Sequence, residues 1–364
     1  MATEKKMSAK EREARKKRKV VIFGIELVVI LIMVGVLWVV MTTPNAGPNV
    51  TVIDPDKVGI PDKVQQEKET GESVLLGYMN VALFGLDATK DRELFKDSRS
   101  DATMIASINL DTGDIKLVSV YRDTYLNNGN DKYEKCNAAY FRGGAEQALK
   151  MLNMNLDMDI ETFVSVGYKG LSKVIDGLGG VWIDVDSDEL EHINSYQIGI
   201  AENLKCDYIP VTNTGFQLLN GVQATAYCRI RYTAGNDFKR TARQREVLMA
   251  MEDAAKKTDL ATLTKVFNDC IGDIYTNIDT EDILKLLENI GKYHIAEEDG
   301  FPQESMRTVA NIGSGNSCVV PLDLEENVVW LHEFLFENQD YEVTDTVKEI
   351  NQIIKNNTSK YIQK

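Results

Sequence analysis

Arg229, Arg231, Arg240 and Gln244 lie in one short stretch of the sequence at a spacing that suits one anion. Arg229 and Arg231 are two positions apart, so in an extended segment their side chains point to the same side. Arg240 and Gln244 are four positions apart, so near the start of a helix they share a face close to its positive end, where Asp237 can cap it. Arginines aimed one way repel one another unless an anion neutralises them, and a guanidinium fork matches phosphate geometry. The cluster therefore predicts a phosphate-binding site, and a surface held by salt bridges to nearby acids is the alternative.

A second set of charged residues falls at the ends of predicted strands. Asp87 follows one strand, Arg99 and Asp101 stand just before the next, and Arg122 and Asp123 end the strand after that. Loops at strand ends are where α/β proteins place functional residues. The grouping of these residues therefore favours a functional site over ordinary solvated turns.

The elements that must position these residues are short strands interleaved with helices. Such a pattern is typical of an α/β protein, here an α/β/α sandwich with a central mixed sheet. We expect strands at residues 80–85, 102–109, 115–120, 163–167 and 181–185, and helices at 138–153, 168–176, 220–227, 238–257, 260–271, 280–290 and 322–338. Residues 110–114 should close a hairpin, and the polar tail at 351–364 should fray.

The first 41 residues predict a membrane anchor. Residues 1–19 hold nine lysines or arginines against three glutamates, and residues 20–41 form an apolar run whose only charge is Glu26. A run of that length spans a bilayer as one helix. The basic flank places the N-terminus in the cytoplasm and the following residues outside the cell, in a single-pass cell-membrane protein. A cleaved signal peptide is the alternative, but the run is long for one and no small-x-small cleavage site closes it.

The chain divides into five predicted segments. They are a cytoplasmic basic leader (1–19), a transmembrane helix (20–41), an extracellular stalk (42–76), a catalytic domain (77–258) and a C-terminal helical extension of the ectodomain (259–364). The stalk is inferred from four prolines and little hydrophobic periodicity. From residue 42 onward 52 acidic residues face 32 basic ones, a formal charge of −20, and such a surface repels nucleic acid.

Several other chemistries lack their motifs. The three histidines, His192, His294 and His332, are far apart and form no His-Glu-x-x-His pair. Neither a Gly-Lys-Ser/Thr phosphate loop nor a Gly-x-Ser-x-Gly elbow occurs. The five cysteines (Cys136, Cys206, Cys228, Cys270 and Cys318) allow up to two disulfides of undetermined pairing.

Four blocks of sequence together resemble the LytR-CpsA-Psr family. They are residues 81–123, 135–144, 177–181 and 219–244, in the family's order. This family transfers a phosphoglycopolymer, such as wall teichoic acid or capsule, from polyprenyl pyrophosphate to peptidoglycan as a phosphodiester. The resemblance implies a Mg²⁺-dependent transferase whose partners are a polyprenyl-pyrophosphate-linked glycopolymer, a peptidoglycan acceptor and the membrane. Tyr121 departs from the family's usual proline before the Arg-Asp pair.

The resemblance also implies a role for individual residues. Asp87 and Asp101 match the acids that hold Mg²⁺, and two carboxylates with pyrophosphate and water suit Mg²⁺ better than zinc. The residues that match the pyrophosphate-binding set are Arg99, Arg122, Lys135, Arg229, Arg231, Arg240 and Gln244. Asp101, Arg122, Arg229, Arg231 and Arg240 are the expected catalytic residues. The sequence does not identify a general base.

The implied chemistry is attack by a sugar hydroxyl on the phosphorus that carries the glycan, with the metal and the arginines neutralising the pyrophosphate. The prenyl chain needs an apolar channel between sheet and helices, expected from residues 145–156 and 163–175, although ordinary core packing explains these apolar stripes equally well. Two alternatives remain open. One is a pyrophosphatase that uses water as acceptor, and the other is a non-enzymatic anchored receptor or regulator that binds an anionic glycolipid.

Overall fold

The computed structural model describes residues 49–88, 94, 95, 97–233, 235–278, 294–313 and 316–362. The predicted leader at 1–19, the predicted membrane span at 20–41 and the predicted helix at 280–290 lie outside these residues. Within the described part of the chain, no helix has the length and hydrophobicity that crossing a bilayer would require.

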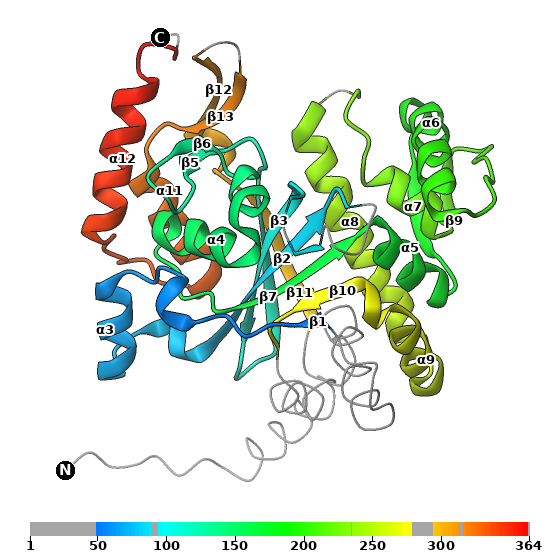
Figure 1. The fold of residues 1–364 in the computed structure, drawn as a ribbon, viewed down its shortest axis with the longest axis horizontal. Coiled ribbons are helices and arrows are strands. Elements are labelled where there is room, and N and C mark those ends of the chain that lie inside the picture. The colour runs from blue at the N-terminus through cyan, green and yellow to red at the C-terminus, as the bar shows by residue number, and fades with distance from the viewer. Residues whose placement is uncertain are drawn as a thin grey trace, which may run out of the picture.

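A seven-stranded mixed sheet lies at the centre of the described residues (Figure 1). β2 (Tyr78–Leu86) pairs antiparallel with β3 (Ser100–Asn109) and parallel with β7 (Thr162–Gly167), and β4 (Asp114–Val120) pairs parallel with β11 (His294–Phe301). The predicted α/β class with a central mixed sheet is confirmed. The strand order is β1 (Asn49–Val50), β10 (Ile274–Thr276), β7, β2, β3, β4 and β11.

One group of helices covers one side of this sheet. It consists of α4 (Ala138–Leu156), α11 (Leu324–Phe336) and α12 (Asp345–Thr358). Alternate residues of β2, namely Ala82, Phe84 and Leu86, are buried in the same cluster as these helices, as the two-residue period of a strand requires. The expectation that residues 145–156 line a lipid channel is therefore wrong, because Leu149 and Leu152 are fully buried in this core.

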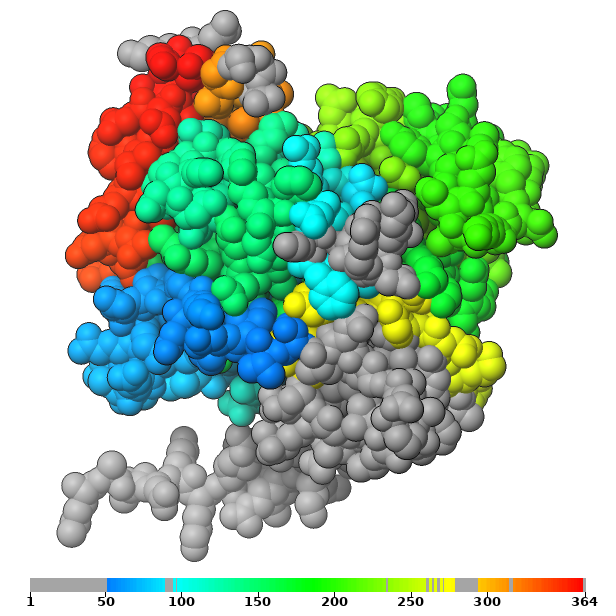
Figure 2. Space-filling model, viewed as in Figure 1, coloured from blue at the N-terminus to red at the C-terminus, as the bar shows by residue number. Residues whose placement is uncertain are grey.

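A second group of elements lies on the other side and forms its own core. It consists of α5 (Tyr168–Gly177), α6 (Ser187–Leu204), α7 (Gly221–Tyr227), α8 (Asn236–Lys256), α9 (Leu260–Cys270) and the hairpin of β8 (Val181–Val185) with β9 (Gly215–Leu219). Ile175, Ile193, Leu219 and Val247 are buried in this second cluster. In the space-filling view much of this group forms a green lobe beside the rest of the molecule (Figure 2).

The described part of the predicted stalk is folded, which corrects that prediction. Residues 49–77 form β1, α3 (Asp62–Thr70) and two short 3-10 turns, Pro55–Lys57 and Val74–Gly77. β1 joins the central sheet beside β10, and Val58, Val64 and Leu75 are buried in the main core. Three widely spaced apolar residues suffice to dock the segment, yet they produce no periodic pattern in the sequence.

The predicted helical extension at 259–364 is correct in part: the expected helices at 260–271 and 322–338 match α9 and α11, but the segment also contributes strands. It supplies β10 and β11 to the central sheet and a hairpin of β12 (Arg307–Ile312) with β13 (Asn316–Pro321). The tail does not fray over its described length, since α12 runs to Thr358 and buries Ile350 and Ile354 against the core. A smaller hairpin, β5 (Tyr125–Asn127) with β6 (Tyr133–Lys135), follows the loop after β4.

Candidate functional site

A cavity of about 630 Å³ lies between the sheet and helices α5 to α8. Its polar lining residues come from one edge of the sheet, where β2 ends, β3 begins and β4 ends, and from residues 229–244. They include Asp87, Asp97, Arg99, Asp101, Arg122, Arg229, Arg231, Arg240 and Gln244. Its apolar lining includes Leu83, Met104, Val164, Val166, Leu171, Val247 and Leu248. The structure thus brings together all predicted site residues except Lys135, and it confirms that residues 163–175 contribute to the apolar wall.

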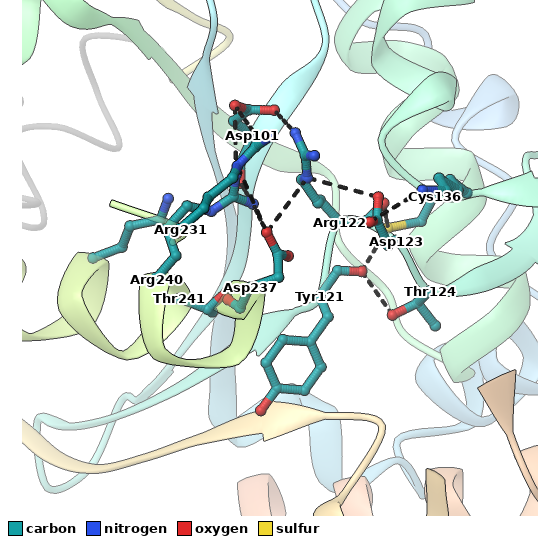
Figure 3. A network of polar contacts seen from close by, with 12 residues as sticks. Asp101, Tyr121, Arg122, Asp123, Thr124, Cys136, Arg231, Asp237, Arg240 and Thr241 are labelled. Carbon is teal, nitrogen blue, oxygen red and sulfur yellow. Dashed lines mark hydrogen bonds and ion pairs between the residues drawn. The ribbon is translucent and has the colours of Figure 1, made fainter. Parts of the chain in front are cut away.

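Asp101 is the centre of the polar half of the cavity (Figure 3). Arg122 donates to its Oδ1 at 2.6 Å, and Arg231 donates to its Oδ2 at 3.1 Å. Arg240 lies 3.7 Å from Oδ2 and also donates to the Asp101 carbonyl at 3.2 Å. Burial alone would raise the pKa of the Asp101 carboxyl, but the charges of Arg122, Arg240 and Arg231 outweigh it and hold that pKa below its usual range.

A second carboxylate, Asp237, holds the same arginines. Its Oδ1 lies 2.8 Å from Arg240, 3.6 Å from Arg122 and 3.9 Å from Arg231. The sequence predicted Asp237 as a helix cap, but Gly235 is the N-cap of α8 and the Asp237 side chain turns toward the arginines instead. Three guanidinium groups therefore share these two carboxylates, and Arg122 also lies 3.6 Å from Asp123. The salt-bridged alternative is correct in that the arginines pair with acids, yet Asp101 and the three arginines line a cavity.

Arg240 is the most deeply buried of these arginines. Its side chain is 1% exposed, and burial lowers its pKa to about 10. Its Nε and Nη1 atoms have no hydrogen-bond partner, and neither has Oε1 of Gln244, one helical turn further on. Buried polar atoms without partners are rare in folded proteins and need a reason. A ligand that fills the cavity and accepts hydrogen bonds would satisfy the Arg240 nitrogens.

Arg229 sits apart from the Asp101 cluster and faces Asp87. Its Nη2 lies 3.9 Å from Oδ1 of Asp87, and the Tyr168 hydroxyl donates to that same oxygen at 2.7 Å. The Arg229 guanidinium carbon lies 4.5 Å from the ring centre of Tyr168 and 5.6 Å from that of Tyr196. Burial raises the pKa of Tyr168 above its usual value, so its hydroxyl stays protonated and donates.

Arg99 and Lys135 hold different positions around this site. Arg99 lines the cavity, with its guanidinium carbon 6.0 Å from the ring centre of Phe141. Lys135 does not line the cavity, and its Nζ pairs with Oδ2 of Asp123 at 3.1 Å. Asp123 in turn lies 3.6 Å from Arg122. The predicted contact of Lys135 with the anion is therefore replaced by an indirect role through Asp123 and Arg122.

Tyr121 stiffens the loop that carries Arg122. Its backbone N–H donates to the Phe301 carbonyl at 3.0 Å, which extends the β4–β11 ladder by one residue, and a proline could not donate this bond. Its carbonyl accepts from the Thr124 hydroxyl at 2.6 Å and from the Cys136 thiol at 3.2 Å. Burial raises the pKa of the Cys136 thiol, so this sulfur stays protonated.

The carboxylates fit Mg²⁺ only as part of a site shared with substrate. Among the described residues, no group of three or more His, Cys, Asp or Glu side chains could hold a metal. Asp87 and Asp101 line the same cavity, and Mg²⁺ commonly binds one or two carboxylates together with phosphate oxygens and water. Both oxygens of Asp101 already accept from arginines, whereas both recorded contacts of Asp87 involve Oδ1.

These features define a mixed α/β protein with an arginine-lined anion site at the sheet edge, next to an apolar cavity. Residues 56–322 match the model of the LytR_cpsA_psr family. The chain belongs to the LytR-CpsA-Psr family, as the four sequence blocks predicted.

Some curated relatives are named teichoic acid transferases, and others are named regulatory proteins, such as MsrR of Staphylococcus aureus. The chain is 31% identical over 180 residues to the polyisoprenyl-teichoic acid–peptidoglycan teichoic acid transferase TagT of Bacillus subtilis, which covers 49% of this chain and 52% of that protein. It is 26% identical to TagU of Oceanobacillus iheyensis over 78% of this chain and 85% of that protein. The chain thus spans about half the length of the first curated relatives it matches.

A solved relative supports the fold. The structure of TagT with bound octaprenyl pyrophosphate lipid superposes with a TM-score of 0.52 at 22% identity and covers 72% of this chain and 92% of that one. At this identity the likeness establishes a shared fold.

One further arginine in the same helix is structural, which gives a matched comparison. Arg243 is buried and donates to Glu189 at 2.7 Å, to the Thr233 hydroxyl at 2.7 Å and to the Ile230 carbonyl at 3.2 Å. Arg231 is 31% exposed, and its partner Asp101 has two other arginines. Removing Arg243 therefore takes away a guanidinium group that Glu189 contacts in the core, whereas removing Arg231 leaves Asp101 with two other arginines.

We predict that Arg243→Ala lowers the free energy of unfolding by about 3–5 kcal/mol, because it leaves the Glu189 carboxylate buried without its partner. Arg231→Ala should change it by less than about 1 kcal/mol, as expected for a half-exposed pair. Urea denaturation of both variants measures the difference. Equal destabilisation would contradict the division between an anion-binding and a structural arginine.

Proposed function

We propose that this protein transfers a phosphoglycopolymer, of the wall teichoic acid or capsule type, from a polyprenyl-pyrophosphate carrier to peptidoglycan and forms a phosphodiester. The observation that carries the proposal is the convergence of Arg122, Arg231 and Arg240 at the polar side of an apolar cavity. A lipid pyrophosphate matches both features, because its phosphates suit the arginines and its prenyl chain suits the apolar cavity. Membership of the family and the named transferases among its relatives support the same activity.

The first step of the proposed mechanism is an exchange of anions. In the described structure Asp101 and Asp237 neutralise the three arginines. A pyrophosphate entering the cavity brings negative charge and phosphoryl oxygens that accept hydrogen bonds, and it can satisfy the buried Arg240 nitrogens that lack partners. Meanwhile the prenyl chain lies along the apolar wall that includes Val164, Val166 and Leu248. Exchange costs little reorganisation because the arginines are already gathered.

The second step is phosphoryl transfer. The oxygen of an acceptor sugar hydroxyl bonds to the phosphorus that carries the glycan, the anhydride bond to the other phosphorus breaks, and polyprenyl phosphate leaves with the bonding electrons. The hydroxyl proton passes to the leaving phosphate or to solvent. Arg122, Arg231 and Arg240 stabilise the charge on the transferring and leaving phosphates. Asp87 and Asp101 would hold Mg²⁺ at this site, where the ion would help to neutralise the charge of the pyrophosphate.

Asp101 is a poor candidate for the base that takes the hydroxyl proton. Its pKa is held below the usual range by the three arginines, and both of its oxygens already accept hydrogen bonds. A carboxylate of low basicity removes protons inefficiently. We therefore assign Asp101 to holding cations, both the guanidinium groups and the metal.

We predict that Asp101→Ala lowers acceptor-dependent release of polyprenyl phosphate by on the order of 100-fold, the usual cost of losing one main electrostatic group. The assay uses a labelled polyprenyl-pyrophosphate glycan with and without Mg²⁺ and peptidoglycan. Asp114→Ala, at the opposite end of β4, is the control and should retain activity.

The same assay separates the alternatives. Release that peptidoglycan stimulates and that needs Asp101 supports the transferase. Equal release with and without peptidoglycan would identify a pyrophosphatase instead. Tight lipid binding without release by the unaltered protein would identify a receptor.

The proposed function also implies where the catalytic residues lie relative to the cell membrane. Lipid-linked polymer and peptidoglycan meet outside the cytoplasm, so we propose that residues 20–41 anchor the chain in the cell membrane with the catalytic residues outside. The basic leader supports this orientation.

We predict that protease added to intact spheroplasts cleaves the region from residue 42 onward, because that region faces the medium. Immunoblotting with antibodies against this region measures its loss, and a cytoplasmic protein serves as the control for lysis. Protection in intact spheroplasts with cleavage only after lysis would contradict the proposed topology.

A further inference from the structure

Tyr168 contacts two residues of the candidate site through different parts of its side chain. Its hydroxyl donates to Oδ1 of Asp87 at 2.7 Å. Its ring lies against Arg229, whose guanidinium carbon is 4.5 Å from the ring centre. Neither the strand-end pattern nor the arginine spacing singled out this tyrosine.

The register of the sheet explains why Tyr168 reaches both residues. β7 runs parallel to β2, and Gly167 at the end of β7 is paired with Leu86 at the end of β2. A Cβ atom on Gly167 would lie 3.0 Å from the carbonyl oxygen of Ala88, so the glycine permits a close approach of the loop that carries Asp87. Tyr168 follows at once as the first residue of α5.

The contact with the ring holds Arg229 in a useful orientation. A guanidinium stacked on an aromatic face keeps its N–H donors at the edge of the plane, where they remain available. Tyr196 from α6 adds a second ring at 5.6 Å. All three side chains line the cavity, so the stacked Arg229 lies beside the space that the ligand would fill.

The hydroxyl contact has a separate effect on Asp87. Both contacts recorded for this carboxylate, from Tyr168 and from Arg229, involve Oδ1. A carboxylate fixed through one oxygen presents the other in a defined direction. Asp87 is half exposed, at 51% for the side chain, so without the hydroxyl its side chain would have other rotamers open to it.

We propose that Tyr168 is a positioning residue that aligns Arg229 toward the pyrophosphate through its ring and Asp87 toward the divalent cation through its hydroxyl. This inference rests on the proposed function. It assigns the two halves of one side chain to two different parts of the ligand, so the halves are separable by mutation.

The test measures binding of polyprenyl pyrophosphate, with and without Mg²⁺, by purified variants. Tyr168→Phe keeps the ring and removes the hydroxyl, so affinity without Mg²⁺ should stay within about twofold, whereas the gain in affinity on adding Mg²⁺ should fall by about tenfold. Tyr168→Leu removes both parts and should also weaken binding without Mg²⁺ by about fivefold. Tyr196→Leu should weaken binding without reducing the gain from Mg²⁺.

Tyr227→Phe is the matched control. The Tyr227 hydroxyl donates to Glu246 at 2.7 Å, the same length as the Tyr168 bond to Asp87, but Tyr227 does not line the cavity. This variant should bind as the unaltered protein does. Melting temperatures identify any variant whose binding is lost through unfolding, and Tyr168→Phe carries the test because it leaves the ring packing in place.

The outcomes separate this inference from the proposed function. An unchanged gain from Mg²⁺ in Tyr168→Phe, or an equal loss in Tyr227→Phe, would overturn the role of Tyr168 while leaving the proposed function standing. If the unaltered protein bound no polyprenyl pyrophosphate, the proposed function would fail and this inference with it.

Discussion

The site depends on one electrostatic constraint: the positive charges of three arginines repel one another where they meet at one end of the strands. Arg122, Arg231 and Arg240 converge within hydrogen-bonding or ion-pairing reach of Asp101, and three such groups would repel one another without anions between them. The antiparallel β2–β3–β4 arrangement brings the Asp101 and Arg122 loops to one edge, and the start of α8 adds Asp237 and Arg240. The fold therefore supplies the carboxylates that keep the arginines together before any ligand arrives.

This arrangement links stability to function. Asp101 and Asp237 offset much of the arginine charge, which lets Arg240 be buried although burial lowers its pKa. These two carboxylates do not satisfy all the hydrogen-bond donors of Arg240, because two of its nitrogens lack hydrogen-bond partners. A pyrophosphate supplies the missing acceptors, and the apolar wall beside the arginines accommodates a lipid chain. Arg243, in the same helix, has a hydrogen-bond partner at each of its three side-chain nitrogens.

The elements that could be predicted are those whose own residues show a clear pattern of apolar positions, turns or spacing. β2, β3 and β4 have dense apolar residues and clear turns, and Arg240 and Gln244 share a helix face as their spacing requires. β11 could not be predicted, because an edge strand with the sequence HIAEEDGF gains its conformation from pairing with β4 and not from its own pattern. Asp237 and Tyr168 were missed for a related reason: their partners Arg122 and Asp87 are far away in sequence and come near only through the fold of the sheet.

The central claim is that the arginines exchange carboxylates for a lipid pyrophosphate inside the cavity, and a crystal structure of this protein with bound polyprenyl pyrophosphate tests it most directly. The account predicts phosphate oxygens in hydrogen-bonding contact with Arg122, Arg231 and Arg240, and a prenyl chain along the wall that includes Val164 and Leu248. A complex in which those guanidinium groups still bind only Asp101 and Asp237, with the phosphates outside the cavity, would contradict it.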